Sequence, residues 1–424
     1  MTETTENPGS TASPDTLRDL LTDQLIEQGN IHSKPVEAAF RAVPRHLFAP
    51  EVAPGKAYAA ESVVATKKDE HGITVSSVSA PSIQATMLEQ AEITPGMRVA
   101  EIGSGGVNAA MLAELVGEDG EVVTGDIDLF VTDRARRFLD ATGYARVRVV
   151  TADGEDGFPG HAPLDRLLVT VGSWDIPPAW MDQLADHGRL VVPLRMRGLT
   201  RSVAFDKEDG HLVSRSAEIC GFVTMQGAGA HKERLLLLRG KEIGLRFDDD
   251  WGADPEALNG ALDTGRAEVW SGVTVGRGET FGGLQMWLAT AVDGFCQLSV
   301  DAKLDTGLVA PQNRIACPAV VEGGSFAYLT VNRTEDVPGE PVFEFGAHGF
   351  GPDGPAVAGR FAEQIRIWDR DYRHGPDPVI YAYPAATPEE DLPQGRVIPK
   401  RHVRVVISWP QEGQGIQHNP TKEK

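Results

Sequence analysis

Cysteines and long apolar runs are scarce in this chain, and each scarcity excludes a class of protein. The three cysteines, Cys220, Cys296 and Cys317, are far apart and have neither metal-ligand spacing nor the pattern of a disulfide framework. No apolar run is long enough to cross a bilayer, and the first residues lack the apolar core of a signal peptide. We therefore expect a cytoplasmic protein with buried thiols, no membrane partner and no metal site.

Positive charge is also in short supply. The chain has 40 lysines and arginines against 61 aspartates and glutamates, which gives a formal net charge of −21 at pH 7. This charge repels a phosphate backbone, so a nucleic-acid partner is not expected. A small metabolite, a peptide or a protein suits the balance of charges better.

The length of the chain and a change in its secondary-structure pattern predict two domains. A chain of 424 residues exceeds one typical domain. Residues 1–14 are polar and predict a disordered terminus, and residues 413–424 predict a loose tail. Strand-like and helical patterns alternate over 15–234, whereas this rhythm is lost over 235–412. We predict an α/β domain followed by an α+β accessory domain.

The first domain is organised around Arg98 to Ala113, RVAEIGSGGVNAAMLA. Val99, Ala100 and Ile102 predict a buried strand, which breaks into a turn of small residues and resumes as a helix. Glycines at such a turn let the backbone approach a ligand, and the helix N-terminus offers free N–H groups. A strand, a glycine turn and a helix in this order are typical of a nucleotide-binding α/β sheet.

Four further strands alternate with helices after this unit, over 120–128, 147–150, 164–171 and 188–194. This alternation predicts a doubly wound, mostly parallel, Rossmann-like sheet. An acidic residue at the end of the second strand suits hydrogen bonding to the two hydroxyls of a ribose. Asp126 is the first candidate for this contact and Asp128 the second.

Two clusters of polar side chains leave alternatives open. Ser76, Ser77 and Ser79 precede a helical pattern that starts at Pro81, so they predict either a helix N-cap or a row of donors facing a polar substrate. The pattern alone favours the cap. Three adjacent carboxylates at 248–250 could bind a metal, but a solvated turn is the more common setting of such a run.

Four segments of the first half resemble the protein-L-isoaspartate O-methyltransferase family, in the order of its motifs. They are the N-terminal signature RAVPRHLFAP, the active-site segment VSAPS, the cofactor motif VAEIGSGG and a long run from Ala152 to Leu194. The resemblance implies a class I methyltransferase with S-adenosyl-L-methionine as cofactor and a carboxylate as acceptor. Because a carboxylate is ionised at neutral pH, no general base is expected.

The resemblance also implies which residues bind the cofactor. Gly103, Ser104 and Gly105 form the turn that the methionine part and the sugar approach. Glu101 either orders that turn or binds the methionine ammonium group. Asp126 takes the ribose hydroxyls.

The remaining implied contacts involve the base of the cofactor and the substrate. Asp153 accepts from the adenine amino group, unless it only starts a turn at Gly154. Ser79 is the implied catalytic residue, which orients the substrate carboxylate by a hydrogen bond. Val78 and Trp174 are further implied substrate contacts.

Several departures from the family's usual pattern bear on the substrate. Val107 stands where a glycine is usual, with Gly106 one place earlier, so the turn is expected to follow a different path. Ala60 replaces an acid near the substrate entrance, and Trp174 adds a bulky indole to the peptide pocket. The long C-terminal extension is likewise absent from housekeeping members.

A subgroup with such an extension acts on ribosomally made peptides, and the resemblance extends to these aspartate methyltransferases of FxLD lanthipeptide and graspetide systems. It implies methylation of one Asp in a cyclised precursor peptide, whose ester collapses to an aspartimide or isoaspartate, with 235–412 as the substrate-recognition domain. The alternative is general repair of isoaspartyl proteins. A third hypothesis is a binding scaffold in which Val107 disables the cofactor turn; the presence of Asp126 and Asp153 argues against it.

Overall fold

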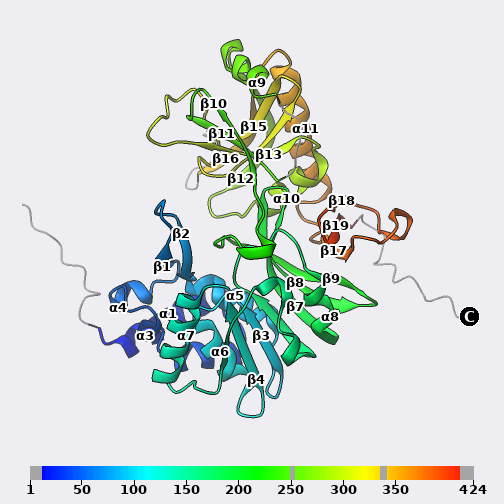
Figure 1. Ribbon diagram of the computed structural model, residues 1–424. Helices are drawn as coiled ribbons and strands as arrows, with labels where there is room; N and C mark the ends of the chain where they lie inside the picture. Colours follow the sequence, from blue (N-terminus) through cyan, green and yellow to red (C-terminus); the bar gives the residue numbers. More distant parts are fainter. Residues whose placement is uncertain (1–11, 249–253, 335–340, 411–424) are drawn as a thin grey trace, which may run out of the picture.

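The computed structural model describes residues 12–248, 254–334 and 341–410 (Figure 1). It contains a ten-stranded sheet, a seven-stranded sheet and a separate hairpin of two strands, β1 (Val64–Lys68) and β2 (Thr74–Val78). The predictions for the two ends of the chain fall almost entirely outside the described residues. Asp249 and Asp250 of the acidic run also lie outside them.

The ten-stranded sheet contains the predicted parallel core. Its five parallel strands are β3 (Arg98–Ile102), β4 (Glu121–Asp126), β5 (Arg148–Thr151), β6 (Leu164–Val169) and β7 (Leu184–Met196). They lie in the order β5-β4-β3-β6-β7, so the chain starts at β3, builds outward to β5 and returns to the other side of β3. This reversal opens a crevice at the carboxyl ends of β3 and β6, where sheets of this kind bind ligands. The doubly wound, Rossmann-like fold is confirmed.

Three helices of this half follow a residue whose side-chain oxygen accepts a backbone N–H: α1 (Pro14–Glu27) after Ser13, α2 (Lys34–Ala42) after Ser33 and α7 (Leu129–Ala141) after Asp128. α6 (Val107–Val116) is mostly apolar and is buried except at Glu114, which suits its position between α2 and the strands β3 and β4. The other helices are α3 (Arg45–Phe48), α4 (Pro54–Ala57), α5 (Pro81–Ala91) and α8 (Pro178–Gln183).

Antiparallel strands extend this sheet beyond β7. First come β8 (Leu199–Glu208) and β9 (His211–Ile219), and then three strands from the end of the chain: β17 (Val379–Pro384), β19 (Val403–Ser408) and β18 (Arg396–Pro399). The prediction that 235–412 forms one separate unit therefore differs from the observed sheet. The local pattern could not reveal this, because a strand partner far along the chain leaves no mark on periodicity.

The seven-stranded sheet is antiparallel and lies above the first in Figure 1. Its strands, in spatial order, are β10 (Arg234–Leu238), β11 (Ile243–Phe247), β13 (Phe295–Val300), β14 (Cys317–Glu322), β15 (Ser325–Thr334), β16 (Val342–Phe350) and β12 (Ala267–Gly276). Its helices are α9 (Pro255–Ala261), α10 (Gly282–Ala291) and α11 (Gly354–Asp371). α11 packs along β12, β15 and β16 because Val357, Phe361, Ile365 and Trp368 recur at helical spacing and are buried.

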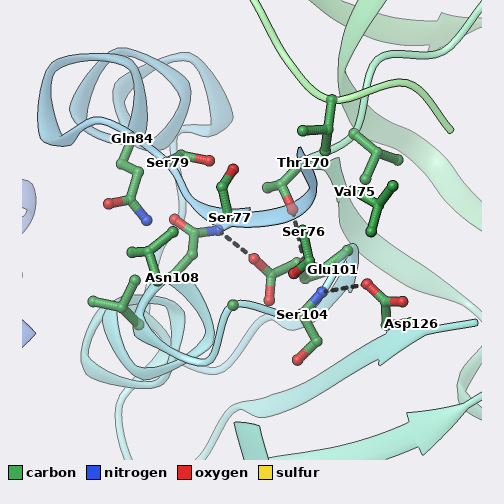
Figure 2. Close-up of a pocket in the computed structure, with 16 residues that line it drawn as sticks. Val75, Ser76, Ser77, Ser79, Gln84, Glu101, Ser104, Asn108, Asp126 and Thr170 are labelled. Atoms are coloured by element: carbon green, nitrogen blue, oxygen red, sulfur yellow. Dashed lines mark hydrogen bonds between the residues drawn. The ribbon is translucent and has the colours of Figure 1, made fainter. Parts of the chain in front are cut away.

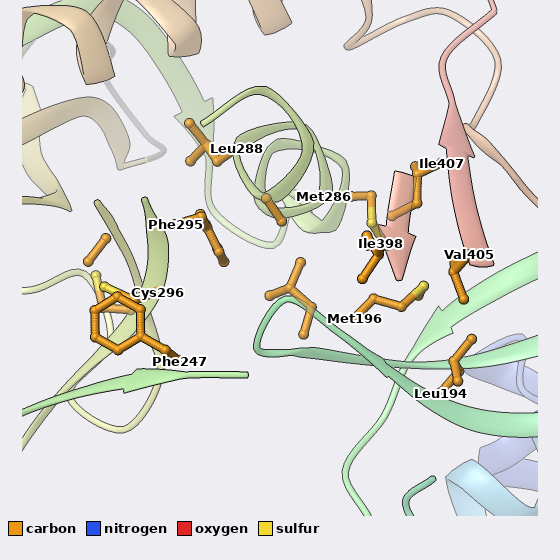
Figure 3. Close-up of a cluster of buried hydrophobic side chains, with 14 of the residues drawn as sticks. Leu194, Met196, Phe247, Met286, Leu288, Phe295, Cys296, Ile398, Val405 and Ile407 are labelled. Carbon is orange, nitrogen blue, oxygen red and sulfur yellow. The ribbon is translucent and has the colours of Figure 1, made fainter. Parts of the chain in front are cut away.

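One hydrophobic core runs between the two sheets (Figure 3). Met196 of β7 belongs to the same buried cluster as Met286 of α10 and as Ile398, Val405 and Ile407 of the C-terminal strands. Because burial of apolar surface is the main stabilising contribution in folding, these contacts bind the C-terminal half to the first sheet. None of the helices in the described ranges has the length and apolar composition needed to cross a bilayer.

Candidate active site

Two cavities lie at the carboxyl ends of β3, β4 and β6, where the strand order reverses. The first has a volume of about 440 Å³ and is lined by β2, by the glycine turn after β3 and by the end of β6. The second, of about 460 Å³, extends toward Gly154 and Met225. Val75, Gly103 and Asp126 line both cavities. Figure 2 shows the polar side chains of the first cavity converging from segments far apart in the sequence.

The glycine turn is shaped by contacts that a side chain would block. A Cβ on Gly103, whose φ is 95°, would lie 2.7 Å from Thr170 Oγ1 at the end of β6. A Cβ on Gly106, whose φ is 83°, would lie 3.1 Å from the ring of Phe48. Val107 is the first residue of α6 and is buried. The turn accepts a valine at 107 because Gly106 has already taken the positive φ.

Glu101 is a fully buried carboxylate beneath this turn. It accepts hydrogen bonds from Asn108 Nδ2 at 2.9 Å and from Thr124 Oγ1 at 2.6 Å (Figure 2 shows the first). Burial raises the pKa of Glu101 to about 7, and the two hydrogen bonds oppose that rise. These contacts tie the end of β3 to the start of α6 and to β4, and the Glu101 side chain also lines the first cavity.

The two candidate ribose acids have different surroundings. Asp126 accepts the backbone N–H groups of Asp128 at 2.9 Å and of Ser104 at 3.4 Å, and burial raises its pKa. Asp128 caps α7 by accepting from Phe130 N at 2.9 Å, and it forms an ion pair with Lys67 of β1. Since both partners of Asp128 are structural, Asp126 is the acid better placed to receive a ligand.

Asp153 has structural partners within the described residues. Its carboxylate caps the 3-10 turn η2 (Gly154–Asp156) by accepting from Glu155 N at 3.0 Å, and it also accepts from Ala228 N at 2.9 Å. Gly154, not Asp153, lines the second cavity, and a Cβ on Gly154 would lie 2.5 Å from Ile102. The alternative that Asp153 starts a glycine turn matches these contacts.

The N-cap interpretation of the serine cluster is wrong. Ser76 and Ser77 lie in β2, and the residue before α5 is Ala80, which has no side-chain cap. The N–H of Ser82, at the second position of the helix, is satisfied instead by the carbonyl oxygen of Ala60 at 3.0 Å. Ser76, Ser77 and Ser79 all line the first cavity, so the other alternative, a row of donors facing a ligand, fits the structure.

A buried arginine holds the segment that contains Val78 and Ser79. Arg45 of α3 is 1% exposed and donates to Ser79 O at 2.6 Å and to Ala57 O at 2.7 Å. Burial lowers the pKa of Arg45 to about 10, so the guanidinium stays charged at neutral pH. Val78 is itself buried beside the cavity wall. The sequence interpretation missed Arg45, whose signal was a cation within an otherwise apolar segment.

Trp174, an implied substrate contact, lies outside the cavity that contains Ser79. It lines a third cavity, of about 470 Å³, together with Arg195 and His231. The indole stacks on the His231 ring at 4.0 Å between centroids, and Lys400 Nζ lies 4.4 Å from the indole centroid. These partners come from the chain after residue 230, so the motif around Trp174 gave no sign of them.

Other residues at the site also escaped the sequence interpretation. Thr170 Oγ1 donates to Gly103 O at 2.8 Å and fixes the turn from the side of β6. Gln84 of α5 lines the first cavity. Gln226 lines the second, and its Nε2 donates to Val75 O at 3.4 Å. These residues belong to a strand end, a buried helix face and an irregular loop, where no periodic pattern singles out one side chain.

Among the described residues, no group of three or more histidine, cysteine, aspartate or glutamate side chains could hold a metal ion. Asp248 is the described member of the acidic run. Its carboxylate pairs with Arg195 Nε at 2.6 Å and accepts from Gly198 N at 2.5 Å. Asp248 therefore has a structural role at the junction of the two sheets.

Known proteins match the half of the chain that builds these cavities. The sequence profile of the protein-L-isoaspartate(D-aspartate) O-methyltransferase family matches residues 16–230. The chain is 37% identical over 219 residues to a protein-L-isoaspartate O-methyltransferase of Methanopyrus kandleri, covering 51% of this chain and 94% of that protein. It is 40% identical over 190 residues to one of Gloeobacter violaceus, covering 43% and 88% respectively.

Solved structures of similar proteins align as well. A protein-L-isoaspartate O-methyltransferase aligns with a TM-score of 0.48 and 21% identity, over 86% of this chain and 96% of that one. A β-aspartate methyltransferase of Plasmodium falciparum, in complex with S-adenosyl-L-homocysteine, aligns with a TM-score of 0.44 and 16% identity, over 49% and 98%. The assignment rests on the family profile, which spans half of the sequence. The chain belongs to the protein-L-isoaspartate(D-aspartate) O-methyltransferase family.

Proposed function

We propose that the protein uses S-adenosylmethionine to methylate the isoaspartyl carboxylate of peptides and proteins. The observation that carries this proposal is the first cavity, in which the glycine turn after β3, the carboxylate of Asp126 and the residue Ser79 line one space. That combination suits a nucleoside-containing methyl donor next to an oxygen acceptor.

The cavity residues fit a cationic cofactor. The first cavity is lined by two carboxylates, Glu101 and Asp126, and none of the described residues that line it is a lysine, arginine or histidine. Gly105 leaves its backbone open, because the nearest heavy atom to a Cβ there would be Ser77 O at 3.8 Å. Ser104 Oγ is buried and has no hydrogen-bond partner within the described ranges. When bound, S-adenosylmethionine supplies an electrophilic methyl group on a sulfonium.

We assign the cofactor contacts from these positions. Asp126 accepts the ribose hydroxyls, which compensates for its burial. The turn of Gly103, Ser104 and Gly105 receives the methionine part and the sugar. The acidic side chains that line the first cavity attract the cationic groups of the cofactor. Gly154 borders the base, since it lines the second cavity.

The acceptor needs little activation. An isoaspartyl carboxylate is already ionised at neutral pH, so no residue has to remove a proton. The task of the protein is to orient the carboxylate and exclude water. Ser79 donates a hydrogen bond that orients the carboxylate, and Arg45 fixes the backbone of Ser79.

Two substrate classes fit this chemistry. The relatives that match bear the name of isoaspartyl methyltransferases, which favours general isoaspartyl substrates over one cyclised precursor peptide. One observation supports a cyclised precursor peptide as the substrate: the chain continues after residue 230, beyond the part that matches the family profile. Both cavities at the strand ends are lined by residues no later than Gln226, so this region would recognise only parts of a peptide outside them.

Mass spectrometry with three substrates tests the proposal. The full-length enzyme is incubated with S-adenosylmethionine and a linear isoaspartyl peptide, its aspartyl counterpart, or a cyclised precursor peptide. We expect the isoaspartyl peptide to gain one methylene and then lose methanol, while the aspartyl counterpart stays unmodified. Methylation of the cyclised peptide alone would show that the enzyme matures a precursor peptide and does not act on general isoaspartyl substrates. Methylation of none of the three peptides would contradict the proposed activity.

A further inference from the structure

Gln84 is held in the first cavity by a buried charge. Arg45 donates through Nη1 to Gln84 Oε1, besides its bonds to the carbonyl groups of Ser79 and Ala57. An arginine has only N–H donors, so the atom of Gln84 that faces it must be the amide oxygen. This contact fixes which way the Gln84 amide points.

The amide nitrogen of Gln84 is therefore directed away from Arg45. Figure 2 shows Nε2 on the side of Asn108, within the group of side chains that line the first cavity. Among the described residues, no acceptor engages Nε2 and the atom is not sealed from solvent. A fixed N–H donor of this kind is available to a bound ligand.

Two other polar side chains of this cavity already have partners within the protein. Asn108 Nδ2 is used by Glu101, and Thr170 Oγ1 is used by backbone carbonyl groups. In the part of the chain that the structure describes, no cationic side chain lines the cavity. An anionic acceptor must therefore be held by neutral donors, of which Ser79 and Gln84 lie five positions apart on the segment that Arg45 fixes.

We propose that Gln84 is a second donor to the acceptor carboxylate, with Nε2 binding one oxygen while Ser79 Oγ binds the other. This inference rests on the proposed carboxyl methylation. In this arrangement the Gln84 amide lies between the Arg45 guanidinium and the substrate. The positive charge of Arg45 polarises that amide and so strengthens its N–H donor. A direct arginine contact would reduce the nucleophilicity of the carboxylate, whereas a neutral amide orients it and leaves it reactive. Arg45 is a positioning residue in this scheme.

The test uses Gln84→Glu, which keeps the shape of the side chain and gives Arg45 a carboxylate partner, so the fold is retained. The new carboxylate faces the substrate carboxylate and repels it. We expect the KM for a linear isoaspartyl peptide to rise roughly tenfold or more at neutral pH, as for loss of a hydrogen bond to a charged group. The Kd for S-adenosylhomocysteine should change less than about threefold. The KM penalty should shrink as the pH is lowered toward the pKa of the new glutamate.

The matched control is Gln24→Glu on the exposed face of α1, which adds the same charge away from the cavity. It should leave the KM and its pH dependence unchanged. An unchanged KM for Gln84→Glu, or a loss of S-adenosylhomocysteine binding in parallel with the KM effect, would overturn the role of Gln84. If the wild-type enzyme methylates no isoaspartyl peptide, the proposed function fails before the variant is compared.

Discussion

Two buried carboxylates, Glu101 and Asp126, line the same crevice but have different partners. Glu101 is tied to two neutral side chains and holds the turn together. Asp126 is held by two backbone N–H groups and remains able to accept from a ligand. This difference is why we propose ordering of the turn for the first acid and cofactor binding for the second.

Replacement of Asp126 tests the second assignment. Asp126→Asn removes a charged acceptor for the ribose hydroxyls, so we expect the Kd for S-adenosylhomocysteine to rise roughly tenfold or more. Isothermal titration calorimetry measures the change. Asp182→Asn, at an exposed position of α8, serves as the control and should bind as tightly as the wild type. Equal affinities for both variants would remove Asp126 from the cofactor site.

Glu101 predicts a pH dependence of stability. Its pKa is raised from 4.5 to about 7 in the folded protein, so between these values the folded state holds a proton that the unfolded state has lost. This contribution to the free energy of unfolding is present at low pH and falls by about 3 kcal/mol as pH rises through the window. Glu101→Gln has no such titration.

Urea denaturation of the ligand-free protein at about pH 5 and about pH 8 measures this effect. We expect the stability of Glu101→Gln relative to wild type to improve by about 3 kcal/mol between the two conditions. A relative stability that stays constant with pH would show that Glu101 is ionised throughout.

The sequence predicted the positions of some site residues and not of others. Asp126 was found because its position at a strand end is a property of the local pattern. The serines were assigned to a cap because their hydroxyls suit either role, and only the packing of β2 against the crevice decides. The cavity beside Trp174 could not be predicted, because His231 and Lys400, the partners of the indole, lie far along the chain.

At the scale of elements, the turn between β3 and α6 sets the crevice. Its shape depends on a positive φ at Gly106 and on the close approach of Gly106 to Phe48 and to Ala135. A residue with a Cβ would bear the cost of the backbone conformation and would also press on α3 and α7. The turn therefore couples three helices to the cofactor site.

Gly106→Ala measures that coupling when it is compared with Gly143→Ala. Gly143 has a φ of 91° but no heavy atom within 4 Å of a Cβ, so it shows the backbone cost alone, about 1 kcal/mol. We expect Gly106→Ala to lose about 1 kcal/mol more in urea denaturation, because the Phe48 ring must move. Equal losses for the two variants would mean that the turn relaxes freely around the new methyl group.

The elements of the first half were largely predictable, since each strand and helix of the parallel core has its own periodicity and stop signals. The bounds of β3, β4 and α7 lie within a few residues of those expected. The pairing of β1 with β2 and the position of the loop around Gln226 were not predicted, because they depend on the cavity that these segments line and not on their local pattern.

At the scale of the whole molecule, the C-terminal half completes the first sheet. β17 pairs with β9, and the strands β17 to β19 bury Ile380, Ala382, Val405 and Ile407. Arg195 of β7 pairs with Glu233 and Asp248, which adds a charged junction between the sheets. A boundary at residue 235 therefore cuts through shared packing.

Truncation after residue 234 shows the consequence. The fragment would expose Leu194 and Met196 of β7 and leave the edge of β9 unpaired. We expect it to aggregate or to unfold without a cooperative transition, as judged by size-exclusion chromatography and thermal denaturation. A monomeric fragment that unfolds cooperatively and binds S-adenosylhomocysteine like the full chain would show that the first half folds alone.

The most direct test is a crystal structure of the full chain with S-adenosylhomocysteine and a linear isoaspartyl peptide. We expect the ribose hydroxyls to donate to the carboxylate of Asp126, and the isoaspartyl carboxylate to lie within hydrogen-bond distance of Ser79 Oγ. A peptide bound instead in the cavity beside Trp174, or along the seven-stranded sheet, would contradict it.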